Sequence, residues 1–367
     1  MNEIELTQEL VRINSENPPG NEKKIAKYIK DFLEDLKIQT KLIEFEKNRV
    51  NLIASIGKGK GLMLNGHMDT VPAGDLNNWK YDPFGGKTVK GKLYGLGSSD
   101  MKGGLATILI AVKNLAREDF KKKLLLTFVA DEESGQTGTR YLVKNRKDIF
   151  KDIKYGLTAE SNDLKITIAQ KGVTHLTIKL KGKAAHGSTP ELGDNAILKA
   201  SDFIQELKKL TKKLKNKKNK MLGNGTISIG TINGGTKVNI VPDFCEIEVD
   251  RRLIPGETPT IALNQIKRLL KKLKIKAEIE TYVNRLPMQV SKNFELIKIL
   301  NKIEKFKKVG EPGYTEIELY YREAGVPCIT LGPGLARLAH VSNEYIPIKN
   351  LRKAVKIYEQ LIRKVCL

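Results

Sequence analysis

Three short clusters of acidic and histidine residues contain the side chains with which this chain could bind metal ions. They are Gly66-His67-Met68-Asp69, Asp100 inside Gly97–Gly104, and Asp131-Glu132-Glu133-Ser134-Gly135. Each cluster follows an apolar run or lies in a glycine-rich turn, and α/β proteins place their chemistry at the carboxyl ends of sheet strands. Together with Glu160 and His340, the clusters contain the ligand types of a two-metal hydrolase. Two of the four histidines in the chain belong to this set.

The spacing of His67 and Asp69 puts both side chains on one face of an extended segment, because residues i and i+2 point the same way. Asp69 could then accept the second ring N–H of His67, a contact that supports a metal-bound histidine. The alternative is an ordinary turn at a strand end. Asp100 could bridge two cations through its two oxygens, or it could simply cap the helix that follows it.

The adjacent carboxylates of Glu132 and Glu133 follow an apolar run, where they repel each other and lose hydration. A divalent cation would remove that cost. Since neighbouring side chains do not easily face one ion, we expect one of the two to bind metal and the other to face the substrate water as a general base. The alternative is a solvated turn.

Glu160 and His340 complete the set but are not diagnostic by themselves. Glu160 follows a strand-like run, Tyr155–Ala159, and His340 lies in a short polar segment after a glycine turn. A lone histidine is more often structural than a ligand. His175 is such a case, because it falls on the polar side of a predicted strand, and we assign it no role.

The segments around these residues alternate between strand and helix patterns, which predicts an α/β first domain. Apolar residues at helical spacing indicate helices over 3–11, 23–36 and 105–115, the last of them directly after Gly103-Gly104. Predicted strands cover 41–46, 51–55, 61–64 and 124–130. The last of these strands is continuously apolar, as is typical of a buried parallel sheet.

The pattern changes near Lys171. Strands over 172–181, 226–232, 245–253 and 276–283 and helices over 195–214 and 260–273 follow in the order β-α-β-β-α-β, which is the ferredoxin-like plan. After residue 286 the α/β pattern returns, with helices over 293–306, 316–324 and 350–365 and a strand over 327–331. We therefore expect a first domain in two parts, residues 1–171 and 286–367, with a small α+β domain, residues 172–285, inserted between them.

The composition limits the class of protein. A chain of 367 residues with 40% hydrophobic content favours two domains with packed cores. It has no apolar run of membrane-spanning length, and its N-terminus is polar and acidic, so we expect no membrane span and no secretory signal. The three cysteines, Cys245, Cys328 and Cys366, are far apart, which fits a reducing cytoplasm and argues against a disulfide framework.

The formal net charge of +23 raises the question of nucleic-acid binding. Part of the basic excess lies in residues 199–220, where Leu207, Leu210 and Leu214 recur at helical spacing and the lysines therefore form a solvated face. Few aromatic residues accompany them and no nucleic-acid-binding motif is present. We expect no nucleic-acid partner, although the positive field could attract acidic substrates.

The motif set resembles the family of zinc deacylases and exopeptidases that includes acetylornithine deacetylase, succinyl-diaminopimelate desuccinylase, aminoacylase and glutamate carboxypeptidase. The resemblance covers nearly the whole chain. It rests on Gly-His-Met-Asp-Thr-Val-Pro, Ser-Asp-Met-Lys-Gly-Gly, Asp-Glu-Glu-Ser-Gly and Ala-His-x-x-Asn-Glu in that order. It implies a zinc-exopeptidase-type catalytic domain with a mixed sheet and an inserted ferredoxin-like lid and dimerisation domain.

The resemblance also implies roles for the clustered residues. His67, Asp100 and Glu160 would bind one divalent cation, and Asp100, Glu133 and His340 the other. Zinc suits such ligands best, and cobalt or manganese would also fit. Asp69 would orient His67. Glu132 would take a proton from the bridging water and pass it to the leaving amine.

The inserted domain carries further residues that match the family. His186 matches a lid histidine that stabilises the oxyanion in relatives, often from the partner subunit, which implies a homodimer built through the lids. Asn239 and Arg252 match lid positions that hold the substrate, and Arg252 would clamp a carboxylate. Gly332 and Gly334 resemble a backbone loop beside the substrate. For Asn239 and Arg252, an ordinary structural role is the alternative.

The sequence departs from the family pattern at two places: Leu96 stands where many relatives have Arg, and Gly313-Tyr314-Thr315-Glu316 replaces Gly-Thr-Ser-Asp. Glu160 resembles the deacylases and carboxypeptidases, whereas Asp marks many dipeptidases. We therefore predict a cytoplasmic enzyme that hydrolyses a small N-acyl amino acid, with succinyl-diaminopimelate and acetylornithine as the leading substrates. A carboxypeptidase or dipeptidase on the same scaffold is the alternative, and a catalytically inactive binding protein is a third reading that would need a broken ligand set.

Overall fold

A mixed β-sheet forms the centre of the first of two structural units. The computed structural model describes residues 1–367. The first unit comprises Met1–Ile168, Val290–Val309 and Thr315–Leu367, and the second comprises Ala169–Gln289 and Gly310–Tyr314. The second unit therefore includes a few residues, among them Gly310–Tyr314, that we had expected in the first domain from the sequence.

The large sheet has nine strands in the order β1-β2-β6-β3-β7-β17-β8-β15, with β16 paired to β8. Strand β3 runs parallel to β6 and β7, and β17 runs parallel to β7, whereas β1, β2 and β15 pair antiparallel. Its strands are β1 (Thr40–Glu46), β2 (Arg49–Ile56), β3 (Gly61–His67), β6 (Leu124–Val129), β7 (Ile153–Ser161), β8 (Ile166–Gln170), β15 (Met288–Gln289), β16 (Lys308–Glu311) and β17 (Cys328–Gly332). Every residue of β3 and β6 is buried, which explains why both strands are mostly apolar; Asn65 and His67 of β3 are buried polar exceptions.

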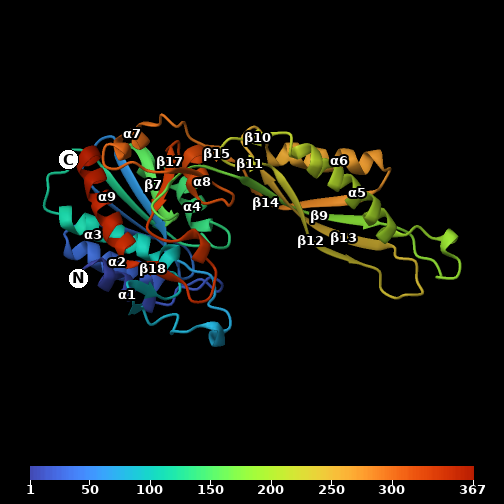
Figure 1. Cartoon of the computed structure of the whole chain (residues 1–367), viewed down its shortest axis with the longest axis horizontal. Coiled ribbons are helices and arrows are strands. Elements are labelled where there is room, and N and C mark those ends of the chain that lie inside the picture. Colours follow the sequence, from blue (N-terminus) through green and yellow to red (C-terminus); the bar gives the residue numbers. More distant parts are fainter. The chain divides into compact units, whose positions relative to one another are not determined.

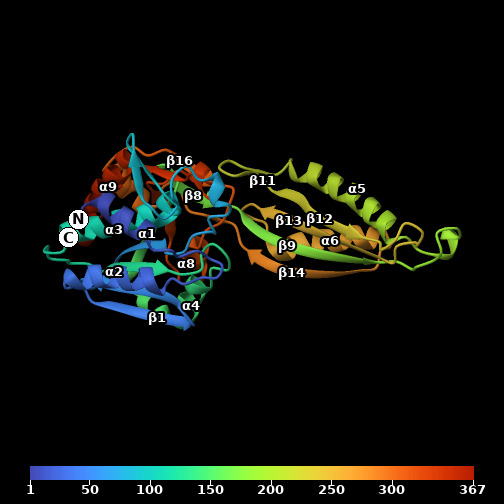
Figure 2. The same cartoon turned by 90° about the horizontal axis from the view of Figure 1, so that it is seen from below.

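Helices cover both faces of this sheet (Figure 2). On one face lie α1 (Glu3–Arg12), α3 (Gly103–Leu115) and α9 (Ile348–Cys366), with α7 (Glu295–Asn301) beside α9. On the other lie α2 (Lys23–Asp35), α4 (Thr137–Asn145) and α8 (Ile317–Glu323). A Cβ atom at Gly104 would lie 2.4 Å from the carbonyl oxygen of Ala159, so this glycine allows α3 to approach β7.

Several short elements were not expected from the sequence. A three-stranded sheet consists of β4 (Lys87–Val89), β5 (Lys92–Tyr94) and β18 (Tyr345–Pro347). The short helical turns are η1 (Leu76–Asn78), η2 (Ser98–Lys102), η3 (Lys147–Phe150) and η5 (Ala336–Leu338). Helix α7 is shorter than expected, since no residue between Asn301 and Phe306 is buried and the segment lacks the packing that would extend the helix.

The second unit contains a four-stranded antiparallel sheet in the order β12-β13-β9-β14 (Figure 1). Its elements are β9 (Gly172–Lys181), η4 (Pro190–Leu192), α5 (Ala196–Leu214), β10 (Lys218–Asn219), β11 (Gly223–Asn224), β12 (Thr226–Gly234), β13 (Phe244–Leu253), α6 (Pro259–Lys272) and β14 (Ala277–Arg285). The two long helices pack on one face of this sheet, where Leu176, Phe203, Ile247 and Ile266 belong to one buried cluster. No helix of the chain combines the length and the apolar character that crossing a membrane requires.

Replacing Phe203 with alanine should destabilise the second unit, because this ring is fully buried between α5 and the sheet. We expect Phe203→Ala to lower the free energy of unfolding by about 3–5 kcal/mol. Phe244→Ala is the matched control, since Phe244 is 43% exposed and should cost less than about 1 kcal/mol. Urea unfolding followed by circular dichroism measures both, and equal losses would contradict the packing described here.

Candidate metal centre

The clustered residues meet at one edge of the large sheet. His67 is the last residue of β3, Glu132 and Glu133 follow β6, and Glu160 lies near the end of β7. These three strands are parallel neighbours, so their carboxyl ends lie side by side. Asp100 belongs to η2, next to the sheet, and His340 lies in the loop after η5.

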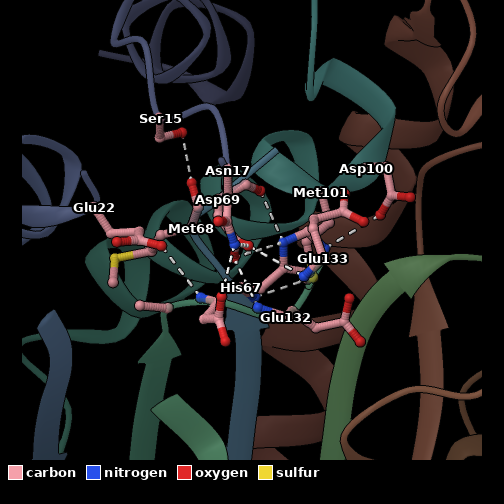
Figure 3. A network of polar contacts seen from close by, with 12 residues as sticks. Ser15, Asn17, Glu22, His67, Met68, Asp69, Asp100, Met101, Glu132 and Glu133 are labelled. Atoms are coloured by element: carbon pink, nitrogen blue, oxygen red, sulfur yellow. Dashed lines mark hydrogen bonds and ion pairs between the residues drawn. The ribbon is translucent and has the colours of Figure 1, made fainter. Parts of the chain in front are cut away.

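Asp100 lies between two imidazole rings and presents a different oxygen to each. Its Oδ1 atom is 3.3 Å from Nε2 of His67, and its Oδ2 atom is 3.7 Å from Nε2 of His340. Its Asp100–Met101 peptide bond is cis. Figure 3 shows the carboxylate close to His67 and Glu133. Asp100 therefore offers one carboxylate oxygen on the side of each histidine.

The remaining carboxylates divide between the two histidines. Glu160 Oε1 lies 3.6 Å from Nε2 of His67, and Glu133 Oε2 lies 2.9 Å from Nε2 of His340. Ligand atoms of His67, Asp100 and Glu133 all lie within 4.8 Å of one another, and so do those of His67, Glu132 and Glu160. The structure thus brings all five predicted metal ligands and Glu132 into one cluster.

The electrostatics of this cluster are unfavourable without a cation. Burial raises the pKa of Glu132, Glu133 and Glu160, and the neighbouring carboxylates raise it further. Burial alone would lower the pKa of His67, but Glu160, Asp100 and Asp69 together raise it well above its usual value. The Oε1 atom of Glu133 is buried without a hydrogen-bond partner. An oxygen-rich cluster of this kind, with two imidazoles, fits divalent cations.

Asp69 makes its shorter contact to His67 through its main chain, and its carboxylate pairs with the same ring nitrogen at a longer distance. The carbonyl oxygen of Asp69 is 2.9 Å from Nδ1 of His67, whereas the nearer carboxylate oxygen is 3.6 Å away. The carboxylate instead accepts the backbone N–H groups of Glu132 and Glu133, each at 3.1 Å. The sequence predicted the partnership with His67, but the carboxylate holds the turn that carries the two glutamates.

A polar network that the sequence did not indicate supports Asp69 (Figure 3). The side-chain amide of Asn17 donates to Asp69 and to Asp131, in both cases at 2.9 Å. Arg49 donates to Asp131 and to the fully buried Glu22. These residues come from four segments of the chain, so only the fold could bring them together.

Glu344 fixes the loop that carries Asp100. Its carboxylate, 1% exposed, accepts the backbone N–H groups of Gly97, Ser99 and Asp100 at 2.6–2.9 Å. Burial, with the charge of Asp100 as a further cause, raises the pKa of Glu344 to about 8. The motif that contains His340 also contains Glu344, but the sequence analysis assigned no role to this glutamate.

A second buried carboxylate, Glu316, lies behind the cluster at the start of α8. Its Oε1 atom accepts a hydrogen bond of 2.7 Å from Asn65, whose carbonyl oxygen accepts the hydroxyl groups of Thr127 and Tyr320. The Oε2 atom of Glu316 is buried without a hydrogen-bond partner. The charge of Glu316 contributes to the raised pKa of Glu132 and Glu160, so it belongs to the same electrostatic system.

His186 and Asn239 lie on adjoining loops of the second unit. The N–H of Gly187 donates to the carbonyl oxygen of Asn239 at 2.8 Å, and the exposed ring of His186 contacts the hydroxyl of Ser188. Arg252 lies near the other end of β13, where it pairs with Asp250 at 2.8 Å and stacks over Tyr314. The loops that carry His186 and Asn239 adjoin the start of β13, at Phe244. At about 3.3 Å per residue, the strand from Phe244 to Arg252 is about 26 Å long.

Gly332 and Gly334 are packed tightly at the end of β17. A Cβ atom would lie 2.1 Å from the carbonyl oxygen of Ala159 at the first position and of Ser99 at the second. Their carbonyl oxygens accept the N–H groups of Leu164 and Asp163. Close packing against the segments that carry Glu160 and Asp100 therefore accounts for both glycines, and a contact to substrate stays a prediction.

The amino-acid sequence is similar to that of known proteins over most of the chain. The model of peptidase family M20/M25/M40 matches residues 63–364. An acetylornithine deacetylase from Proteus mirabilis is 31% identical over 333 residues, which cover 88% of this chain and 84% of that protein.

Solved structures share the fold. An M20 family metallo-carboxypeptidase from Sulfolobus solfataricus superimposes with a TM-score of 0.81 at 22% identity, over 98% of both chains. The aminopeptidase PepT from Bacillus cereus gives 0.81 at 23% identity, over 99% of this chain and 97% of that one. A dinuclear metal-binding peptidase from Bacillus subtilis gives 0.72 at 16% identity, over 98% and 96%. At these identities the likeness establishes the fold alone.

Metal affinity should depend strongly on pH, because the hydrogen bond to Glu133 raises the pKa of His340 to about 9. Below that pH a cation must displace a proton, so affinity should rise about tenfold per pH unit for each proton displaced. Competition with a chromogenic chelator measures this between about pH 6 and pH 9. The slope of log affinity against pH should be smaller by about one in His340→Gln, since one proton fewer is displaced. It should stay unchanged in His175→Gln, the control outside the cluster. A flat profile for the unaltered protein would contradict the assignment.

Proposed function

Because the chain belongs to peptidase family M20/M25/M40, we propose that it is a metal-dependent amidohydrolase that removes a succinyl or acetyl group from an N-acyl amino acid. The observation that carries the proposal is the position of Asp100, with one carboxylate oxygen toward each of two histidines that have their own acidic partners. The similarity to an acetylornithine deacetylase supports a deacylase rather than a peptidase.

In this proposal His67, Asp100 and Glu160 would hold one divalent cation, and Asp100, Glu133 and His340 would hold the other. Zinc is the best match to two imidazoles and several carboxylates, and cobalt would also fit. The buried, unpartnered oxygen of Glu133 supports a cation at this place. When bound, the two ions would supply Lewis acidity that lowers the pKa of a water molecule and polarises the amide carbonyl.

Glu132 is the proposed general base. Gln136 donates a hydrogen bond of 2.9 Å to Oε1 of Glu132, which fixes the carboxylate and leaves Oε2 to exchange a proton. Burial raises the pKa of Glu132, with the charge of Glu316 as the next cause, and a raised pKa suits a group that first takes a proton from water and then delivers it to the leaving amine. Asp69 acts as a positioning residue, since its carboxylate holds the backbone of Glu132.

The second unit would contribute the substrate contacts, as a lid. Arg252 would bind the substrate carboxylate, Asn239 would hold the substrate, and His186 would stabilise the oxyanion. The separation between Arg252 and the loops of His186 and Asn239 along β13 is too long for one small amino acid derivative. A homodimer in which a partner supplies His186 resolves this, because the two residues at one site then come from different chains.

Hydrolysis of a substrate panel tests the proposed reaction. The zinc- or cobalt-loaded protein should hydrolyse N-succinyl-diaminopimelate, N-acetylornithine or another N-acyl amino acid, and a chelator should abolish the activity. Glu132→Gln should lower kcat by at least about 10³-fold while metal content is unchanged, because it removes only the proton carrier. Glu46→Gln, at an exposed position of β1, is the matched control.

Two outcomes would contradict this proposal. Cleavage of dipeptides or C-terminally extended peptides alone would move the assignment to a dipeptidase or a metallo-carboxypeptidase on the same scaffold. A Glu132→Gln variant with the unaltered rate would remove Glu132 as the base.

Mixing two inactive variants tests the role of a partner chain. If His186 acts across a dimer, His186→Ala and Arg252→Ala chains each form inactive homodimers, but the mixed dimer contains one intact site. Random mixing should then restore about a quarter of the normal activity. Activity that stays at the residual level of the separate variants, or a monomer in light scattering, would show that His186 does not act in trans.

A further inference from the structure

A hollow of about 890 Å³ opens on the first unit, apart from the candidate metal ligands, none of which lines it. Its walls are the turn between β4 and β5, the segment from η5 to β18, and the first half of α9. Figure 1 shows α9 and β18 within this unit. Its volume falls in the range of about 300–1,000 Å³ that is usual for small-molecule sites.

The charge of the lining is strongly one-sided. Seven of its side chains are lysine or arginine, and Asp163 is its only acidic one. The whole chain has 65 basic residues against 42 acidic ones, so the excess in the hollow is far greater than the composition of the chain explains. The seven cations also come from three separate segments of the chain. Two cations lie at the β4–β5 turn, one lies in η5 and four lie in α9.

Several of these cations have no partner within the protein. Lys90, Lys349 and Lys356 are exposed, and none of them forms an ion pair or a side-chain hydrogen bond in the structure. Two others have carboxylate partners at the rim, namely Arg352 with Glu3 at 3.6 Å and Lys353 with Glu304. The hollow therefore keeps uncompensated positive charge.

Tyr345 is held between two further cations of the hollow. The guanidinium group of Arg337 donates to its hydroxyl at 3.2 Å, and Lys92 lies over its ring at 4.1 Å from the centroid. The hydrogen bond from Arg337 and the charge of Lys92 lower the pKa of Tyr345. The aromatic ring is thus covered by Lys92 and packed against Tyr94, and it does not offer a free face for a nucleic-acid base.

The N-terminus of α9 adds to the positive potential. This helix has 19 residues, no side-chain cap and no acidic residue in its first turn. The N–H of Ile348 donates to the carbonyl oxygen of Gly91, which ties the helix start to the β4–β5 turn. Backbone N–H groups and the helix dipole favour an anion at such an end, in addition to the lysine side chains.

We propose that this hollow binds a small polyanion that carries a diphosphate or triphosphate group. Several lysines around one concave space match a compact group with several negative charges, and a single carboxylate would leave most of them unpaired. A bounded hollow also favours a small molecule over the extended backbone of a nucleic acid, which needs a longer basic track and exposed aromatic faces. The chain segment that lines the hollow from Leu335 to Asn350 also contains His340 and Glu344, so the ligand would contact the segment that supplies both residues.

Calorimetric titration of the metal-loaded protein with inorganic tripolyphosphate tests this proposal. The Lys349→Gln/Lys356→Gln variant removes two exposed cations of the hollow, and Lys58→Gln/Lys60→Gln removes two exposed lysines of the β2–β3 turn with the same change in net charge. We expect the unaltered protein and the control to bind equally, and the Lys349/Lys356 variant to bind about tenfold more weakly or worse. Tripolyphosphate bound at the metal centre would be common to all three proteins and would not produce this difference.

Two further probes identify the source of the phosphate group. Tighter binding of a nucleoside triphosphate than of tripolyphosphate, with the same dependence on Lys349 and Lys356, would support the proposal and assign a nucleotide. Equal affinity of all three proteins for tripolyphosphate would overturn it, as would no binding at about 100 mM salt. Binding of single-stranded RNA that depends on these lysines, without binding of tripolyphosphate, would also overturn it in favour of a nucleic-acid surface.

Discussion

The carboxylates at the end of the large sheet impose the central electrostatic constraint on this protein. Asp100, Glu132, Glu133 and Glu160 lie together in a largely buried place. Burial and the neighbouring carboxylates raise the pKa of the three glutamates and so disfavour their charged forms, whereas the two histidines keep the pKa of Asp100 below its usual value. Two imidazoles compensate only part of this charge. The cluster is therefore costly for the folded chain alone, and the surrounding structure is arranged to hold these groups together for a positively charged occupant.

Buried side chains hold the cluster in place mostly through hydrogen bonds to the backbone of the loops that carry it. Glu344 fixes three N–H groups of the Asp100 loop, and Asp69 fixes the N–H groups of Glu132 and Glu133. Asn17 in turn holds Asp69. In this arrangement a substitution at Glu344 or Asp69 can displace Asp100 or the two glutamates, because the backbone of each depends on a carboxylate from another part of the sequence.

The two units carry different kinds of information about function. The first contains the clustered histidines and carboxylates of the candidate metal centre. The second has Arg252 near one end of β13 and the loops of His186 and Asn239 near the other. The basic hollow beside α9 belongs to neither role, and its chemistry is that of an anion site.

The sequence by itself determined the ligand types, the strand ends that carry them and the alternation of helices and strands, because these follow from local periodicity and residue chemistry. It predicted many of the longer helices and strands where apolar residues recur regularly, but it missed α4 and β8, and it missed β4, β5 and β18, which are too short to have a period. Only the tertiary structure decided that Asp69 acts on His67 through its carbonyl group, that Asn17, Glu316 and Glu344 support the cluster, and that cations from three segments form one hollow. Apart from the contact between Asp69 and His67, these contacts join residues tens to hundreds of positions apart, and their partners are chosen by packing, which no local pattern encodes.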